Sequence, residues 1–370
     1  MSRLPNSYIE VLRAPSAGFA EMVDALLAQV PSEATPLRLT FFGRPSSNAM
    51  YMERWQLLRQ KMAARFGEAM PALSYVAQPP LDAPLLLELY GCRLREGEQL
   101  IYGETAETPY VLLRTDAGCF LFTGGFRGED LTQTIARQAE QAFRHLEETL
   151  RETGFPLNSI LRQWNYIERI TAFEGEDQHY QAFNNVRSAH YAQTEWPTGY
   201  PAATGIGTHF GGVSIAVDTA LLTASDAYAT PIDNRLQVAA HAYSGEVLEV
   251  ANQHKTTPKF ERAKCLTGGK ERLIYVSGTA AIRGEESLKQ EGLARQLAVT
   301  MENIQELIGS TPLVYLRVYL KNPADYAEAV RLLADYVSGI PITFMWADVC
   351  REELLIEIEG LAKEIGSSFI

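Results

Sequence analysis

One stretch of this sequence occurs twice, and this repeat limits the possible folds more than any other feature. Residues 120–150 and residues 274–308 each begin with a short apolar segment that ends at a glycine, Gly124 or Gly278, and continue into an Arg-Gly-Glu turn. In both, a long segment containing Ala-Arg-Gln follows, with apolar residues three and four positions apart, which is typical of an amphipathic helix. A repeat of this kind indicates two copies of one structural unit.

The order of the predicted elements continues to match beyond this stretch. In each copy a strand, a second helix, a proline and a final strand follow, and the proline is Pro201 in one copy and Pro341 in the other. We therefore predict an α/β (α+β) fold with an internal duplication, each unit a mixed sheet covered by helices. The predicted strands are 160–170 and 211–219 in the first copy, and 313–322 and 352–360 in the second.

We place the boundary between the two copies near residue 225. Residues 1–225 would form an N-terminal half with an extra N-terminal segment, and residues 226–370 would form a C-terminal half that carries most of the site. Further strand signals occur in residues 1–118 and 221–270. We expect these stretches to extend the two sheets rather than to form a third unit.

Charge and cysteine usage restrict the partners of the chain. With 33 basic and 45 acidic residues, the net charge of −12 argues against nucleic acid or an anionic membrane as the main partner. The start of the chain lacks the apolar core of a signal peptide, and no apolar run is long enough to cross a membrane. The four cysteines are far apart and the six histidines form no metal-binding motif, so we expect a reduced cytoplasmic protein without a metal.

The C-terminal copy resembles the reactive intermediate deaminase (Rid) superfamily over residues 270–362. The resemblance lies in LIYVSGTAAI (273–282), LVYLRVYLKNPADYAEAV (313–330) and ADVCREELLIEIEG (347–360). It implies small α/β units that assemble as trimers, with sites at the interfaces between units. Rid deaminases carry an arginine about fifteen residues before the strand glutamate, and this position is Ile342 here, which argues against imine deamination.

From about residue 110 onward, the chain resembles the chorismatases more closely. The matching segments are WNYI (164–167), YPAATGIG (200–207), PKFERA (258–263), VSGTA (276–280) and ADVCREELLIEIE (347–359). Chorismatases remove pyruvate from chorismate to give a hydroxybenzoate or a dihydroxycyclohexadiene carboxylate. The resemblance implies duplicated Rid-like or chorismate-mutase-like units, no cofactor, a role in secondary metabolism, and 3-hydroxybenzoate as the favoured product. Either a monomer or a homotrimer fits this resemblance.

Glu357 is the first candidate for catalysis. Along its strand, Leu355, Glu357 and Glu359 face one side, and the aligned position of the first copy is Ala216. A solvated strand face is the alternative interpretation. The resemblance places the acid/base of chorismatases at this glutamate. Breaking an enol ether needs a general acid near neutral pH, and burial beside an anionic substrate would raise the pKa of a glutamate into that range.

The resemblance also gives Cys350 a role in how the ring intermediate collapses to an aromatic product, while a small buried hydrophobe is the equally open alternative. Arginines are suited to bind the two carboxylates of the substrate, because their fork of donors matches a carboxylate. The candidates for binding are the arginines Arg262, Arg187 and Arg317, the hydrogen-bonding residues Tyr243 and Thr204, and the loop residues Ser277, Gly278 and Thr279.

Two other functions remain open at this point. One is a Rid-type imine or enamine deaminase, and the other is a metabolite-binding Rid-like protein without catalytic activity. RNA cleavage is disfavoured, because the acidic chain has no basic stripe.

Overall fold

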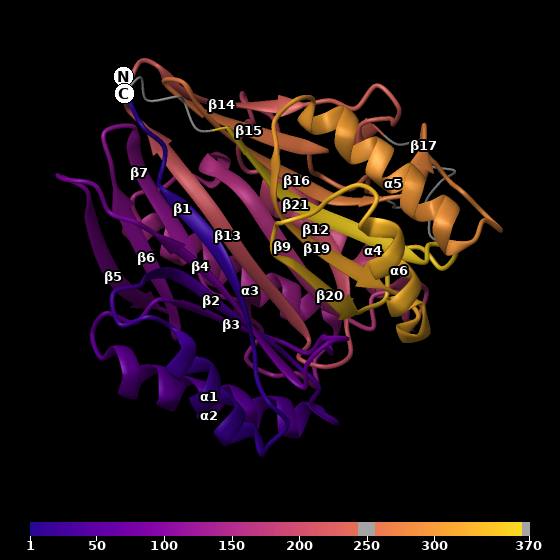
Figure 1. The fold of residues 1–370 in the computed structure, drawn as a ribbon, viewed down its shortest axis with the longest axis horizontal. Coiled ribbons are helices and arrows are strands. Elements are labelled where there is room, and N and C mark those ends of the chain that lie inside the picture. Colours follow the sequence, from indigo (N-terminus) through magenta and orange to yellow (C-terminus); the bar gives the residue numbers. More distant parts are fainter. Residues whose placement is uncertain (243–255, 365–370) are drawn as a thin grey trace.

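The computed structural model describes residues 1–242 and 256–364. Its interior consists of three β-sheets, and a pair of helices packs on the outer face of each sheet. Two of these pairs are visible at the lower edge and at the right of Figure 1. No helix in these two ranges is long and apolar enough to cross a bilayer. The strands of each sheet are neighbours in sequence, so each sheet is built from its own section of the chain.

Sheet 1 is formed by residues 7–92 and has the strand order β1-β4-β2-β3. Only β2 and β3 are parallel. The longer helix, α2, begins after Ser47, whose side chain accepts a hydrogen bond from the backbone of Met50, and ends at Gly67. The elements are β1 (Ser7–Arg13), α1 (Phe19–Gln29), β2 (Thr35–Gly43), α2 (Asn48–Phe66), β3 (Ala72–Val76) and β4 (Leu85–Cys92).

Sheet 2 has the strand order β12-β9-β13-β7-β6-β5, with the short β8 paired to β13. Its long helix α3 begins after Thr134, which caps the backbone of Arg137, and ends at Gly154 with a φ of 81°. The elements are β5 (Gln99–Thr105), β6 (Thr108–Arg114), β7 (Gly118–Thr123), β8 (Phe126–Arg127), α3 (Ile135–Thr153), β9 (Ile160–Glu168), the hairpin β10 (Phe173–Glu174) and β11 (Asp177–Gln178), α4 (His179–Tyr191), β12 (Ala202–Thr208) and β13 (Val213–Leu222).

Sheet 3 has the strand order β14-β15-β16-β21-β19-β20. The chain passes from sheet 2 into this sheet between Leu222 and Ala227. The elements are β14 (Ala227–Ile232), β15 (Ala263–Gly268), β16 (Glu271–Ala280), the hairpin β17 (Ile282–Arg283) and β18 (Glu286–Ser287), α5 (Leu293–Ile308), β19 (Leu313–Leu320), α6 (Tyr326–Leu333), β20 (Ile342–Trp346) and β21 (Ile356–Glu364).

The same unit occurs three times. In every sheet a strand, helix, strand, helix and two further strands follow one another, and the four strands lie in the order first, fourth, second, third. In each case only the second and third strands are parallel. The predicted mixed sheets covered by helices are confirmed, and sheets 2 and 3 are the two predicted copies.

The prediction that all of residues 1–118 would extend those two sheets is wrong for residues 7–92, which form sheet 1 as a third copy. It holds for β5 and β6, which lengthen sheet 2, and for β14 and β15, which lengthen sheet 3. Sheet 1 lacks such an additional pair of strands. The first copy therefore has fewer elements to match the other two in a sequence comparison.

Each sheet has one apolar core between its strands and its helices, which makes three cores. Two more apolar cores lie where the sheets meet. Leu37, Phe120 and Tyr275 of sheets 1, 2 and 3 belong to one inner core. Phe42, Trp164 and Tyr319 belong to the other. Because the inner face of each sheet is covered by the other two sheets, side chains on these faces are buried even where they are polar.

Candidate active site

A pocket lies between sheets 2 and 3, where β12 runs beside β16. The two sheets are joined there by hydrogen bonds: the backbone amide of Ala203 donates to the hydroxyl of Ser277 at 2.8 Å. The space between its walls is about 590 Å³, part of which is open to solvent. Its lining residues are Tyr180, Arg187, Ala203, Gly205, Pro258, Phe260, Arg262, Gly278, Ala280, Ile282, Cys350, Arg351, Leu354 and Glu357.

Glu357 lies on β21 at the wall of this pocket. Its strand neighbours Ile356 and Ile358 pack into the core under α5, so the glutamate faces the opposite side, toward sheet 2. Its residual exposure is 5%, which rules out the alternative of a solvated strand face. In β16 the register with β21 shifts between Val276 and Thr279, and this irregularity brings Gly278 so close that a β-carbon there would overlap Oε1 of Glu357.

The surroundings of Glu357 favour its protonated form. Burial raises its pKa to about 8, and the nearby negative charge of Glu359 acts in the same direction. Arg162 and Arg262 partly oppose this rise. A carboxyl group with such a pKa is mostly protonated at neutral pH and can donate a proton.

Cys350 lines the same pocket. Burial raises the pKa of its thiol to about 12, and the neighbouring Glu357 adds to this effect. The thiol therefore stays uncharged near neutral pH. An uncharged thiol is a poor nucleophile, so this position offers a small, polarisable surface rather than a thiolate.

Two predicted arginines reach the pocket from opposite sheets. Arg187, on α4 of sheet 2, donates from Nη2 to Oδ1 of Asn184 at 2.6 Å. Arg262 precedes β15 of sheet 3 and donates from Nη2 to the backbone carbonyl of Val238 at 3.0 Å. Both lie on the pocket wall, so this wall carries two positive charges although the chain as a whole is acidic.

The predicted hydroxyl residues lie behind the pocket wall. Thr204 Oγ1 accepts a hydrogen bond from Arg162 Nη2 at 2.5 Å and another from the backbone amide of Gly278 at 3.0 Å. Ser277 donates to the backbone carbonyl of Glu261, and Thr279 donates to that of Ser277. These side chains hold the loop in place, and Gly278 is the loop residue that lines the pocket. Tyr243, also predicted, lies outside the described residues.

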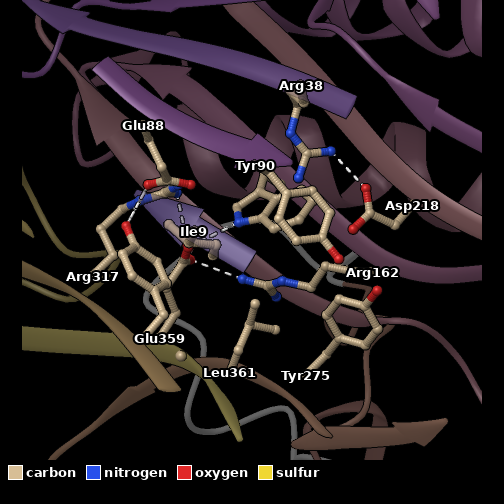
Figure 2. A pocket seen from close by; sticks show the side chains of 13 residues that line it. Ile9, Arg38, Glu88, Tyr90, Arg162, Asp218, Tyr275, Arg317, Glu359 and Leu361 are labelled. Atoms are coloured by element: carbon tan, nitrogen blue, oxygen red, sulfur yellow. Dashed lines mark hydrogen bonds and ion pairs between the residues drawn. The ribbon is translucent and has the colours of Figure 1, made fainter. Parts of the chain in front are cut away.

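Arg317 points away from this pocket, into a second cavity between all three sheets. Figure 2 shows this cavity, in which Arg317 lies near Glu88 and Glu359. Nη2 of Arg317 is 2.7 Å from Glu88, and Nη1 is 2.8 Å from Glu359. A guanidinium that is 2% exposed and held by two carboxylates leaves no donor arrangement suited to a substrate carboxylate.

The ion pairs in this central cavity form a closed ring. Arg38, Arg162 and Arg317 occupy equivalent positions in the three sheets, each directly after a leucine in the second strand of its unit. Each pairs with an acid of the next sheet: Arg38 with Asp218 at 2.6 Å, Arg162 with Glu359 at 2.8 Å, and Arg317 with Glu88. Figure 2 shows all three pairs facing one another.

The cross-strand registers also show how the three copies differ at the position of Glu357. Measured from the equivalent arginines, the matching residues are Glu88 in sheet 1 and Ala216 in sheet 2. Glu88 is held by Arg317 and by the hydroxyl of Tyr315, and Ala216 has no acid group. Of the three equivalent positions, Glu357 is thus the one whose carboxyl lines a pocket without an ion pair in the described part of the chain.

Sequence reasoning missed several lining residues. Pro258 and Phe260 lie within the PKFERA segment, of which only Arg262 was selected. Tyr180 lies seven residues before Arg187 on α4, which puts both on one helix face, and this spacing could have indicated it. Arg351 follows Cys350 directly and also lines the pocket.

Comparisons with known proteins show which family this chain resembles. A family model described as "Chorismatase FkbO/Hyg5-like, N-terminal" matches residues 104–218. A 3-hydroxybenzoate synthase of Streptomyces hygroscopicus is 29% identical over 244 residues, which cover 60% of this chain and 67% of that protein. A chorismatase of Streptomyces rapamycinicus is 29% identical over 227 residues, covering 56% of this chain and 64% of its own length.

The likeness in fold extends further along the chain than the likeness in sequence. A chorismatase crystal structure has a TM-score of 0.73 and 20% sequence identity, and it covers 97% of this chain and 98% of the compared chain. The resemblance to the chorismatase family is therefore confirmed, by sequence over part of the chain and by fold over nearly all of it.

Proposed function

We propose that this protein is an enzyme that converts chorismate and releases pyruvate, with Glu357 as the general acid. The observation that carries this proposal is a buried carboxyl group with a pKa raised to about 8, at the wall of a pocket that two arginines also line. The relatives named chorismatase and 3-hydroxybenzoate synthase support chorismate as the substrate.

The substrate is a dianion, and Arg187 and Arg262 are the groups proposed to bind its two carboxylates. They lie on different sheets, so a molecule bound to both would span the pocket beside Glu357. The two carboxylates of the substrate would raise the pKa of Glu357 further, because they disfavour a third negative charge nearby. Binding would thus keep the acid protonated.

The proposed reaction begins with transfer of the Glu357 proton to the methylene carbon of the enolpyruvyl group. The ether carbon becomes electron-poor. If water adds to that carbon, its bond to the ether oxygen breaks, and pyruvate and a dihydroxycyclohexadiene carboxylate form. If instead the bond between the ring and the ether oxygen breaks, this oxygen leaves as the carbonyl oxygen of pyruvate, and the oxygen of the neighbouring ring hydroxyl bonds to the vacated ring carbon as its proton is lost. Opening of this epoxide at the original hydroxyl carbon, with loss of a ring proton and protonation of the oxygen, gives 3-hydroxybenzoate, and no net water is consumed.

We favour 3-hydroxybenzoate as the ring product. Cys350 lies on the pocket wall and is uncharged, so an apolar, polarisable surface borders the bound ring and would disfavour attack by water. A relative named 3-hydroxybenzoate synthase supports the same product.

One chain contains a complete set of three units, and the site lies between two of them. We therefore propose that the protein acts as a monomer, because further copies would add nothing to the pocket. The four cysteines are free, in keeping with the proposed cytoplasmic location. No metal or cofactor enters the proposed reaction.

The test is incubation of the protein with chorismate, without added metal or nucleotide, followed by chromatography of the products. We expect pyruvate and 3-hydroxybenzoate in equal amounts, and a loss of at least about a thousandfold in turnover for Glu357→Gln. Glu352→Gln, an exposed position shortly before β21, is the matched control and should keep full turnover.

Three outcomes would contradict the proposal. Near-normal turnover by Glu357→Gln would remove its role as the acid. Ammonia release from an imino acid, without action on chorismate, would identify a deaminase. Binding of chorismate without any turnover would identify a metabolite-binding protein.

A further inference from the structure

We propose that Asn184 is a positioning residue that keeps Arg187 available for a carboxylate of the bound molecule by giving it an uncharged partner. This inference rests on the proposed function of Arg187 as a binding residue. It concerns a residue that does not line the pocket itself but holds one that does.

The other buried arginines of this protein provide the comparison. Arg38, Arg162 and Arg317 are 5%, 2% and 2% exposed, and each is paired with at least one carboxylate of another sheet. Arg187 is also 2% exposed. Within the described residues, however, its hydrogen-bond acceptor is the neutral amide of Asn184, and no ion pair joins it to an acid.

A buried guanidinium without an anion is energetically costly, because it loses the solvation that water provides. In the central cavity the protein supplies the anion itself. At Arg187 the described part of the chain supplies no anion, although this arginine is as buried as those of the central cavity. Lys259 adds a second basic group near Arg187. Burial and the positive charge of Arg187 both lower the pKa of Lys259. The arrangement is stable when a bound molecule brings the missing negative charge.

The helix α4 fixes this geometry. Asn184 is fully buried and lies three residues before Arg187, so both point to one face of the helix. The 2.6 Å hydrogen bond from Nη2 of Arg187 to Oδ1 of Asn184 holds one edge of the guanidinium. Nε of Arg187 is buried and has no hydrogen-bond acceptor in the described part of the chain, so the protein leaves this charged donor unsatisfied.

An aspartate at 184 would have nearly the same shape and a negative charge. It would pair with Arg187 as the acids of the central cavity pair with their arginines. The free protein would become more stable, and the guanidinium would be less able to bind an external carboxylate. The amide thus favours binding at the expense of stability in the free protein.

The test compares Asn184→Asp with Asn185→Asp. Asn185 is the adjacent residue, and its Oδ1 already accepts hydrogen bonds from Gln181 and Thr256, so the control adds the same charge without serving Arg187. The probe is 3-hydroxybenzoate, whose binding is measured by calorimetry. In parallel, KM and kcat for chorismate and the melting temperature are measured for each protein.

We expect Asn184→Asp to raise the melting temperature, to weaken binding of 3-hydroxybenzoate at least about tenfold, and to raise KM similarly while kcat changes less than about threefold. Asn185→Asp should change KM less than about twofold. If Asn184→Asp does not fold, Asn184→Ala takes its place. It should raise KM more than it lowers kcat, because Arg187 then loses its orientation.

The outcomes separate this inference from the proposed function. Wild-type protein that binds 3-hydroxybenzoate and loses this binding in Asn184→Asp, but does not act on chorismate, would refute the function and support the inference. Unchanged affinity and KM in Asn184→Asp would overturn the inference while leaving the function intact. Failure of the wild-type protein to bind the probe or chorismate would overturn both.

Discussion

Two glutamates on one strand face have opposite electrostatic properties. Glu357 and Glu359 are two residues apart on β21, and both are buried. Burial raises the pKa of Glu357, whereas Arg317 and Arg162 outweigh burial at Glu359 and hold its pKa below the usual range. Two carboxyl groups whose pKa values are separated by their surroundings take different roles, and here only Glu357 can act as an acid at neutral pH.

The sequence identified Glu357 through its strand position and a family resemblance, but not its charge state. That state depends first on burial and then on the charges of Glu359 and Arg162, which are brought together by the contact between sheets 2 and 3. The same contact explains the result for Arg317. Its own strand gave no sign that Glu88, more than two hundred residues earlier, would occupy its guanidinium.

At Cys350 we predict an effect on the product rather than on pyruvate release. The variant Cys350→Ala replaces the thiol with a smaller methyl group. Glu357 stays in place, and space for water opens beside the ring of the substrate. The fraction of dihydroxycyclohexadiene carboxylate should therefore rise at least about fivefold, while the rate of pyruvate release changes less than about threefold. Chromatography of the products measures both. An unchanged product ratio would show that Cys350 has no part in selecting the product.

At the scale of elements, the long amphipathic helices were well predicted and the short parallel strands were not. The helix α5 lies within its repeated segment, and α3 extends three residues beyond residue 150. Both were recognisable because their apolar spacing is regular over many residues. The strands β12 and β20 were missed. β12 consists mostly of small residues, and its sequence, AATGIGT, has no alternation of apolar and polar side chains.

This strand matters because β12 forms the sheet 2 side of the pocket. Its small residues leave space: a side chain at Gly205 would contact the ring of Tyr180. The small residues of β12 thus explain both its weak strand signal in the sequence and the space for the pocket. Small residues fill little volume and contribute little to a periodic pattern.

The irregularity in β16 is predicted to control the placement of Glu357. In Gly278→Ala the added methyl group would overlap Oε1 of Glu357 and displace the carboxyl group. We expect kcat for pyruvate release to fall at least about a hundredfold with a folded protein, because the proton donor no longer reaches its target. Steady-state kinetics and circular dichroism measure the two properties.

Gly292→Ala is the matched control, since this glycine precedes α5 and has open space where a β-carbon would be added. It should keep wild-type kinetics. Equal activity of the two variants would mean that the close approach of Gly278 has no part in positioning the acid.

At the scale of the whole molecule, the chain is a closed arrangement of three equivalent units. The internal repeat in the sequence corresponds to two of them. The third shares the order of its strands and the Leu-Arg pair at residues 37–38, which also occurs at 161–162 and 316–317. A two-residue match is too short to be significant without the structure. The triplication therefore became evident from topology alone.

Closure of the molecule depends on the ring of ion pairs between sheets. In Asp218→Asn the buried guanidinium of Arg38 loses its counter-charge, and we expect a loss of about 3–5 kcal/mol in the free energy of unfolding. Asp24→Asn, which breaks the surface pair with Lys61, should cost less than about 1 kcal/mol. Urea denaturation followed by fluorescence measures both. Equal losses would show that the ring does not stabilise the contact between sheets.

The same closure predicts a monomer. All three positions around the central cavity are filled by one chain, and each ion pair of the ring is made within that chain. Light scattering after size-exclusion chromatography should therefore give a mass near 41.1 kDa. A mass three times larger would require a further interface that the ring does not provide.

The pH dependence of kcat/KM for pyruvate release from chorismate tests the central claim, that Glu357 donates its proton from a buried, protonated state. This ratio reports the acid in the free protein, where the pKa of Glu357 is raised to about 8. We therefore predict that kcat/KM stays level through neutral pH and falls about tenfold per pH unit above about pH 8. The thiol of Cys350, with a pKa raised to about 12, does not titrate in that range. A kcat/KM that stays constant up to about pH 10, or rises with pH, would contradict the role of Glu357 as the proton donor.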